Sequence, residues 1–242
     1  MKKIIKVLLA LVLVLVVVVV ALLFLGTIVK TGVEKVGPLV TKVPVKLDSA
    51  SLSFFNGSGA LKGFVLGNPE GFKSPEAVKV GAISLRLSRR SVLSDKVVIH
   101  SIRLEQPEIT YETGLKGSNL GKILDNLSSG EKSGGGAPGD KGGNKGAQRK
   151  LQVDEFVITG ARVHVAATML GSTTVPLPEI RLTNLGQGAD GITAAELSKK
   201  VMSEIVAATT KAVAGSAGDV GKGAADQLKK GASGVGDLFK KK

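Results

Sequence analysis

A continuous apolar segment near the N-terminus constrains this chain more than any other feature. It runs from Val7 to Val29, contains no charged residue and follows a lysine-rich start. As a helix rising 1.5 Å per residue it extends about 34 Å, enough to cross a hydrocarbon core of about 30 Å. Lipid offers the backbone no hydrogen bonds, so even a valine-rich segment becomes helical there. We therefore expect residues 1–30 to form a cytoplasmic tip and a membrane anchor.

A cleaved signal peptide is the competing interpretation. Its apolar region would span about 7–15 residues and end in a small-x-small cleavage site, and this segment shows neither feature. An uncleaved anchor is therefore favoured. Three lysines precede the segment and four follow it by residue 46, so the positive-inside rule does not set its orientation. Long C-terminal domains cross membranes largely regardless of charge, which favours a cytoplasmic N-terminus with the bulk of the chain outside the cytoplasm.

Composition argues against most catalytic chemistries. The 242 residues include no Cys and two His, which removes thiolate metal sites, cysteine nucleophiles and disulfides. A metal site would need His100 and His164 to converge with a carboxylate such as Glu105 or Asp154, and no serine lies in a nucleophile-elbow motif. We expect a non-enzymatic protein without cofactor or metal, with an anchored enzyme as the least favoured alternative.

The net charge of +13 lies mainly outside the predicted strands. Residues 1–46 carry +6, residues 128–150 carry +3 and residues 191–242 carry +4. Basic segments beside a membrane are drawn to anionic lipid, or serve as solvated tails. A basic stripe interleaved with stacking aromatic residues is missing, so we expect no nucleic-acid partner.

Two stretches show the short apolar alternation of β-strands, separated by a linker rich in Gly and Lys. Before the linker, Ser118 can cap a short helix, and Gly130 lies just past its end. The helix presents one apolar face, formed by Leu120, Ile123, Leu124 and Leu127. The expected organisation beyond the anchor is a first β-rich region with the short helix, the flexible linker, a second β-rich region, and a C-terminal helix with a basic tail: residues 31–127, 128–150, 151–190 and 191–242.

An internal repeat relates the two β-rich regions. Six apolar positions recur 54 residues later: Val97, Ile99, Ile102, Leu104, Ile109 and Tyr111 match Leu151, Val153, Phe156, Ile158, Val163 and Val165. Each copy skips one residue after its second apolar position, which is typical of a β-bulge. A repeated unit that curves a sheet and ordinary half-buried strands both fit the pattern. Glu105, Glu108 and Glu112 are interpreted as charges on a water-facing strand surface.

The C-terminal helix has a clear start. Thr193 and Glu196 form a capping box, and Ile192 is placed to contact Leu197. Further apolar residues follow at helical spacing. From residue 212 the sequence is rich in Gly, Ala and Lys, as expected for a weak amphipathic helix or a disordered tail.

These patterns predict a β-rich α+β fold. It comprises the transmembrane helix, a curved antiparallel sheet or half-barrel with bulged strands, a short helix in mid-chain and a C-terminal amphipathic helix. Alternation places apolar side chains on one face of the sheet, open as a groove or covered as a core. The candidate residues are Leu52, Phe54, Ile83, Leu85, Ile99, Ile102, Leu104, Phe156, Ile158, Val163 and Val165.

The order of these features resembles the AsmA-like family of bacterial envelope proteins, in particular its short members. After the Lys-flanked span, the segments that carry the resemblance are Gly71-Phe72-Lys73-Ser74-Pro75, residues Ile99 to Glu112, Asn119-Leu120, residues Val175 to Leu182, and the helix start from Thr193 to Lys200. Longer members are anchored in the inner membrane by one N-terminal helix. They extend a β-rich, groove-forming body into the periplasm and are implicated in outer-membrane biogenesis and phospholipid movement.

The resemblance implies a single-pass protein of the bacterial inner membrane, with a periplasmic body and no enzymatic activity. Its concave apolar face would shield acyl chains while headgroups stay in water, so phospholipid and other envelope proteins are the implied partners. The chain is far too short to bridge two membranes alone. The alternative is a tethered structural or interaction protein with a closed β-body, resembling late-embryogenesis-abundant domains, and no role in lipid handling.

Overall fold

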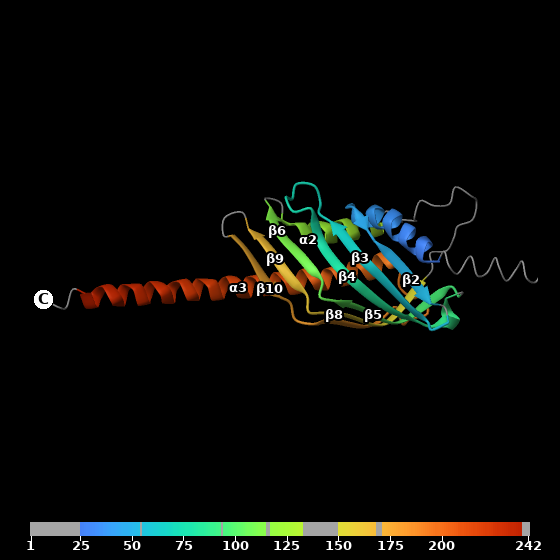
Figure 1. Ribbon diagram of the computed structural model, residues 1–242. Coiled ribbons are helices and arrows are strands. Elements are labelled where there is room, and N and C mark those ends of the chain that lie inside the picture. Colours follow the sequence, from blue (N-terminus) through green and yellow to red (C-terminus); the bar gives the residue numbers. More distant parts are fainter. Residues whose placement is uncertain are drawn as a thin grey trace, which may run out of the picture.

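The computed structural model describes residues 25–53, 55–92, 94–114, 117–132, 150–167 and 171–238. These residues form a strongly curved sheet of eleven strands, with helices packed against it (Figure 1). The prediction of a β-rich α+β fold is therefore confirmed. Both β-rich regions of the sequence contribute to the same sheet.

The strands are β1 (Val45–Lys46), β2 (Ser49–Ser53), β3 (Ser58–Gly67), β4 (Glu76–Leu87), β5 (Lys96–Glu105), β6 (Glu108–Gly114), β7 (Gly117–Ser118), β8 (Lys150–Thr159), β9 (Arg162–Ala167), β10 (Gly171–Pro176) and β11 (Ile180–Leu185). A helix over residues 25–41 precedes them. The others are the short 3₁₀ helix η1 (Arg89–Ser91), α2 (Asn119–Lys132) and α3 (Ala194–Leu238).

Most of the short strands are halves of longer ones. Ile83 of β4 pairs with Leu104 of β5, and Val78 pairs with Ile109 of β6. The two positions on β4 are five residues apart, and so are their partners. β5 and β6 therefore continue one another as a single strand that pairs with β4 in one register. The same holds for β1 and β2 along β3, and for β8 and β9 along β11 and β10. Apart from β7, the described strands therefore build six long strands.

The breaks between the halves fall on one line across the sheet, which we call the crease. Gly63, Gln106 and Gly160 have φ angles of 62°, 51° and 64°, in the left-handed region that interrupts an extended strand. Because several strands turn at the same level, the sheet bends along this line (Figure 1). The pairing registers place these residues on it: Asp48, Gly63, Gly81, Gln106, Gly160 and Pro178.

The 54-residue repeat is confirmed, and its offset is the pairing register. β5 lies parallel to β8, and β6 lies parallel to β9; each residue pairs with the one 54 positions later, from Val97 with Leu151 to Tyr111 with Val165. The expectation of a purely antiparallel sheet is therefore wrong, and the sheet is mixed. Parallel neighbours need a long crossover connection, and the chain that contains α2 supplies it between β6 and β8.

The predicted bulge is present in β5. Arg86 of β4 pairs with Ser101, but the next residue, Leu87, pairs with Ile99, which leaves His100 as the extra residue. In β8 the equivalent Asp154 causes no shift against β11. There the register places Asn184 opposite it, with a φ of 60°, and the bulge expected in the second copy does not shift the pairing.

Helices α2 and α3 pack on the apolar face of the sheet. Three residues of the predicted face of α2 are almost fully buried: Leu120, Ile123 and Leu127. They share one hydrophobic cluster with Leu197, Met202 and Ile205 of α3 and with residues of most strands. The helices therefore fill the concave side of the curved sheet.

The helix ends follow the predicted signals in part. The N–H of Gly121 donates to Ser118 Oγ over 3.1 Å at the start of α2. However, Gly130 was expected just past the end of this helix, and α2 continues to Lys132. The capping box of α3 is confirmed, because the Glu196 N–H donates to Thr193 Oγ1 over 3.1 Å and the Thr193 N–H donates to Glu196 Oε2 over 2.7 Å. α3 extends to Leu238, well beyond residue 212.

The helix over residues 25–41 covers one edge of the sheet. Where β1 and β2 are interrupted, the N–H of Leu47 donates to Glu34 Oε1 over 3.0 Å. The ammonium of Lys30 donates to the Leu47 carbonyl over 2.5 Å and to the Asp48 carbonyl over 3.1 Å. In the part of the chain that the structure describes, no helix is long and apolar enough to span a membrane. Most of the span predicted from Val7 to Val29 lies outside those residues.

Candidate functional site

The predicted apolar face is the first candidate site, and the structure brings its residues onto one side of the sheet. Ile83, Ile99, Ile102, Phe156, Ile158 and Val163 are buried in the hydrophobic cluster. Leu85, Leu104 and Val165 are partly buried against it. Leu52 is also partly buried, and Phe54 lies outside the described residues.

Burial is uneven along this face. On the side of the crease that holds β6 and β9, Ile109 and Val163 are 0% exposed. On the other side, toward the turn between β2 and β3, Ile102 and Phe156 are 8% and 6% exposed. Leu85 in the same row is only partly buried. Val153, farther along β8 than Phe156, is again 0% exposed. The cover of the apolar face is therefore complete over Ile109, Val163 and Val153 and incomplete around Leu52 and Leu85.

A buried polar cluster is the second candidate site. Glu112, only 6% exposed, accepts the N–H of Lys73 over 2.7 Å and that of Ser74 over 2.9 Å. Its own N–H donates to Asn119 Oδ1 over 3.0 Å. Asn119, 0% exposed, donates in turn to Asn68 Oδ1 and to the Thr110 carbonyl, each over 2.8 Å. We call Asn68, Glu112 and Asn119 the polar clamp, because they tie the β3–β4 loop to β6 and α2.

The polar clamp shows that the interpretation of Glu112 as a water-facing charge was wrong, and it brings together segments that are distant in the sequence. Glu112 does not face water as expected. Burial alone would raise the pKa of its carboxyl, but the hydrogen bonds from Lys73 and Ser74 outweigh that effect and leave the pKa lowered. Three segments of the family resemblance meet here, since the Gly71–Pro75 loop contacts Glu112 and Glu112 contacts Asn119. The clamp can hold a loop in place; it offers no nucleophile or paired acid and base.

Charged residues cross the outer face of β5, β8 and β11. Glu155 accepts Arg103 Nη2 over 2.8 Å and also contacts Arg181. The two arginines are about half exposed and Glu155 is 26% exposed, and ion pairs at the surface contribute little to stability. They make the outer face of these strands strongly polar.

The two histidines have different hydrogen-bond partners. His100 Nδ1 lies 2.9 Å from Asp154 Oδ2, and His164 Nδ1 lies 2.9 Å from Thr174 Oγ1. The pKa of Asp154 is lowered, first by a hydrogen bond from Gln152 and then by His100. Within the described ranges, no group of three His, Asp or Glu side chains is placed to hold a metal ion.

No family model and no curated protein matches the chain. The interpretation of both sites therefore rests on their own geometry: a largely covered apolar face, a polar clamp between β6, α2 and the β3–β4 loop, and a charged outer surface.

Proposed function

We propose that this chain is a membrane-anchored, non-enzymatic protein of the bacterial envelope that acts as a tethered interaction module. The observation that carries the proposal is the largely covered concave face: α2 and α3 bury most of the apolar side chains that an open groove would expose. With its apolar face already occupied, the body has its polar outer surface available for partners.

The proposed location is the inner membrane, with a single span, a cytoplasmic N-terminus and a periplasmic body. The apolar segment from Val7 to Val29 supports the span. Its last residues belong to the helix over 25–41, and Lys30 and Glu34 of that helix bind the sheet edge. An anchor joined to the body in this way would hold the sheet close to the bilayer. The resemblance to the AsmA-like family supports the envelope assignment.

Phospholipid handling is the second candidate function, and the uneven cover of the concave face favours it. Acyl chains would enter where Leu52, Leu85 and Leu104 are only partly buried, and α3 would have to move to admit more of them. This candidate predicts contact between lipid and the concave face. The interaction module predicts contact between protein partners and the outer face.

Site-specific photo-crosslinking in living bacteria separates the two functions. A photoreactive residue at Leu85 reports on the concave face, and one at Arg103, which is exposed on the outer face, serves as its matched control on a neighbouring strand. For an interaction module we expect protein adducts at position 103 and adducts only within the chain at position 85. A phospholipid adduct at position 85 would favour the lipid-handling function.

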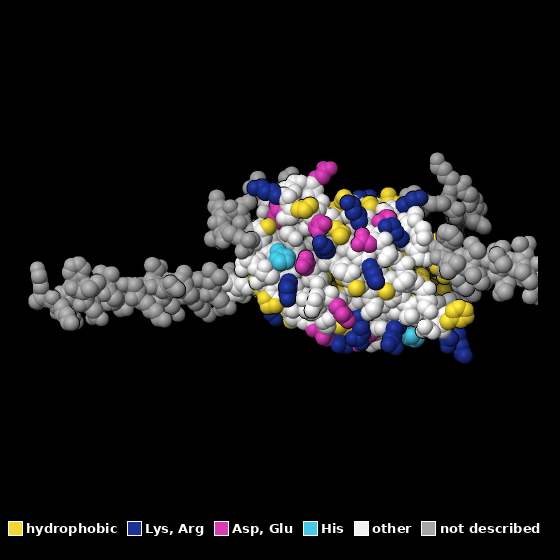
Figure 2. Space-filling model, in the orientation of Figure 1, with side chains coloured by type: hydrophobic (Ala, Val, Ile, Leu, Met, Phe, Trp, Pro, Cys, Tyr) yellow, Lys and Arg dark blue, Asp and Glu magenta, His cyan; other side chains and the backbone are white. Residues whose placement is uncertain are grey.

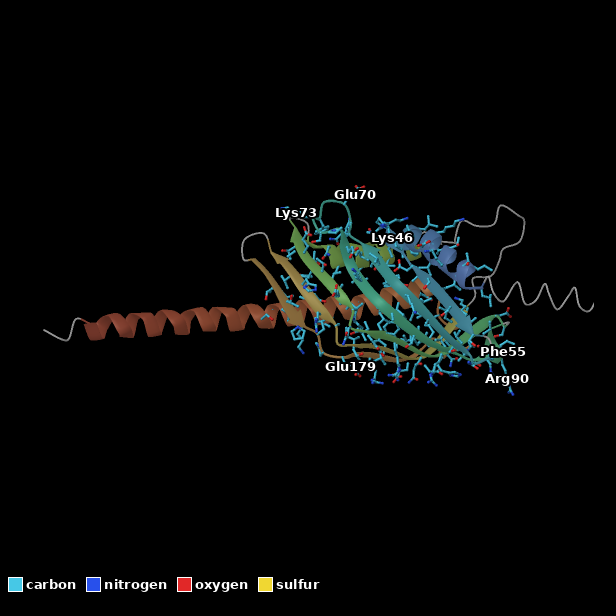
Figure 3. The ribbon with its side chains drawn as sticks, in the orientation of Figure 1. Lys46, Phe55, Glu70, Lys73, Arg90 and Glu179 are labelled. Carbon is cyan, nitrogen blue, oxygen red and sulfur yellow. The ribbon has the colours of Figure 1, made fainter. Side chains whose placement is uncertain are left out.

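The location can be tested because the chain contains no Cys. Glu70 lies in an exposed loop (Figure 3). In cells with a permeabilised outer membrane, we expect E70C to react with a membrane-impermeant maleimide and K3C to stay unlabelled until the inner membrane is lysed. Labelling of K3C alone would place the body in the cytoplasm and contradict the proposal.

A further inference from the structure

The turn between β2 and β3 presents an exposed aromatic side chain beside two arginines. Phe55 is 75% exposed, the largest value among the big hydrophobic side chains that the structure describes, and Ile28 follows at 62%. Arg89 and Arg90 of η1 are exposed as well. Phe55 and Arg90 lie at the same end of the body (Figure 3), where the space-filling view shows hydrophobic and basic side chains together (Figure 2). We call Phe55, Arg89 and Arg90 the tip.

The tip is held in place by hydrogen bonds to the backbone. Arg89 Nη1 donates to the Phe55 carbonyl over 2.9 Å, and the N–H of Leu87 donates to the Gly57 carbonyl over 2.7 Å. Gly57 has a φ of 61°, and a Cβ atom there would lie 2.5 Å from the Leu87 carbonyl oxygen. The backbone that carries Phe55 is therefore well defined, and the side chain projects outward although water solvates it poorly.

The helix over residues 25–41 shows which way the tip points. A Cβ atom on Gly37 would lie 2.7 Å from Val45, and one on Gly26 would lie 2.1 Å from the Ala50 carbonyl oxygen; between them, Lys30 binds the carbonyls of Leu47 and Asp48. Moving along the helix toward the predicted membrane span therefore means moving along β1 and β2 toward Phe55.

For a body held by the proposed anchor, this register places the tip at the end that faces the bilayer. Gly26 belongs to the apolar segment that we propose as the anchor, and Phe55 lies five residues beyond its neighbour Ala50. At about 3.3 Å per residue, the strand and its turn carry Phe55 up to about 16 Å farther in the direction of the bilayer. An exposed side chain at that end of the body is within reach of the lipid headgroups.

We propose that the tip inserts into the interface of a bilayer containing anionic phospholipid, with the Phe55 ring at the boundary of headgroups and acyl chains and Arg89 and Arg90 on lipid phosphates. Apolar side chains combined with basic ones are what such an interface binds, and guanidinium groups pair well with phosphate oxygens. The inference rests on the proposed membrane anchor and adds a second, specific contact between the body and the membrane.

Tryptophan fluorescence tests this contact, because the chain contains no Trp. The full-length F55W variant is reconstituted into phosphatidylcholine vesicles with 30% phosphatidylglycerol, with and without acyl chains brominated near the headgroup. We expect blue-shifted emission and quenching by the brominated lipid. The matched control is E70W, at the loop at the other end of the strands (Figure 3), and its emission should resemble that of indole in water and stay unquenched.

Charge dependence is measured in the same assay. Each basic residue near an anionic surface contributes an attraction that corresponds to about a fivefold change in binding. We expect F55W/R90E to lose most of its quenching in vesicles with phosphatidylglycerol, and F55W to be quenched less in pure phosphatidylcholine. Arg90 is suited to this test because Arg89, not Arg90, donates to the Phe55 carbonyl.

Flotation of the same vesicles distinguishes failure of the tip from failure of the anchor. If F55W floats with the vesicles after alkaline extraction but its indole is unquenched and emits as in water, the tip does not touch the membrane and the inference is wrong. If the protein is released by alkaline extraction, the anchor is wrong and the inference falls with it. Quenching of F55W and E70W to the same extent would also overturn it, since the contact would not be specific to the tip.

Discussion

The polar clamp makes a sharp prediction about stability. In E112Q the side-chain amide keeps one oxygen to accept a hydrogen bond, but its NH₂ group then faces the second N–H of the Lys73-Ser74 pair. A charge-assisted hydrogen bond contributes about 1.5–3 kcal/mol, and a buried N–H without an acceptor costs about 1–3 kcal/mol. Because the β3–β4 loop is only partly buried, we expect a loss of about 2 kcal/mol. For a chain of this size that lowers Tm by about 4–8 °C.

The pH dependence of this loss has a defined sign. The pKa of Glu112 is lowered in the folded protein from its ordinary value of 4.5. A carboxyl group with a lowered folded pKa stabilises the fold fully at pH values above 4.5, and the contribution disappears as the pH falls through the folded pKa. The difference in unfolding free energy between wild type and E112Q should therefore be constant near pH 7 and shrink below about pH 4.5.

Urea unfolding of the full chain in detergent measures both quantities, followed by far-UV circular dichroism and by the fluorescence of Tyr111, the single Tyr. E105Q is the matched control, because Glu105 is exposed on the adjoining strand, and such surface substitutions change stability by less than about 0.5 kcal/mol. If E112Q were as stable as E105Q at pH 7, or if their difference did not change with pH, the carboxylate would not be holding the loop and our reasoning would be refuted.

Three further predictions concern the core, the crease and the start of α3. I123A removes a side chain that is 0% exposed between α2 and the sheet and should cost about 2–5 kcal/mol in chemical denaturation; K122A, exposed on the same helix, should be nearly neutral. G160A places a Cβ at a φ of 64°, 3.2 Å from Gln106, and should lower Tm, whereas G188A meets nothing within 4 Å and should not. T193A breaks the capping box and should cost about 1 kcal/mol, which guanidinium titration would detect; an unchanged midpoint would argue against the cap.

The spacing of apolar residues predicted much of the sheet, because alternation and its interruptions are local properties of the chain. The six matched positions identified both copies of the repeat, and the skipped residue identified the bulge at His100. Strand direction was not predictable in the same way. Apolar alternation looks identical in parallel and antiparallel strands, and the direction depends on the crossover through α2, which packs over the face it crosses.

The polar clamp could not be predicted from residue spacing. Glu112 follows Tyr111 in a strand whose other glutamates face water. Its carboxylate accepts hydrogen bonds from the backbone N–H groups of Lys73 and Ser74, and a backbone donor cannot be recognised from the residue type. Asn119 offered a weak signal, since a buried Asn at the start of a helix needs several partners. The cover of the apolar face by helices could not be predicted from the alternation either, because alternation shows which side of a strand is apolar and not what packs on it.

The attachment of the N-terminal helix to the sheet limits how this protein can be shortened. Removing the hydrophobic leader to obtain a water-soluble form is the usual first step, and a cut just after Lys30 would delete one of the two side chains that satisfy the backbone of Leu47 and Asp48. A cut after Thr41 would expose the whole edge strand formed by β1 and β2, and its unpaired N–H and C=O groups can pair with a second molecule. Truncated forms should therefore begin near residue 25, and those that begin later should self-associate.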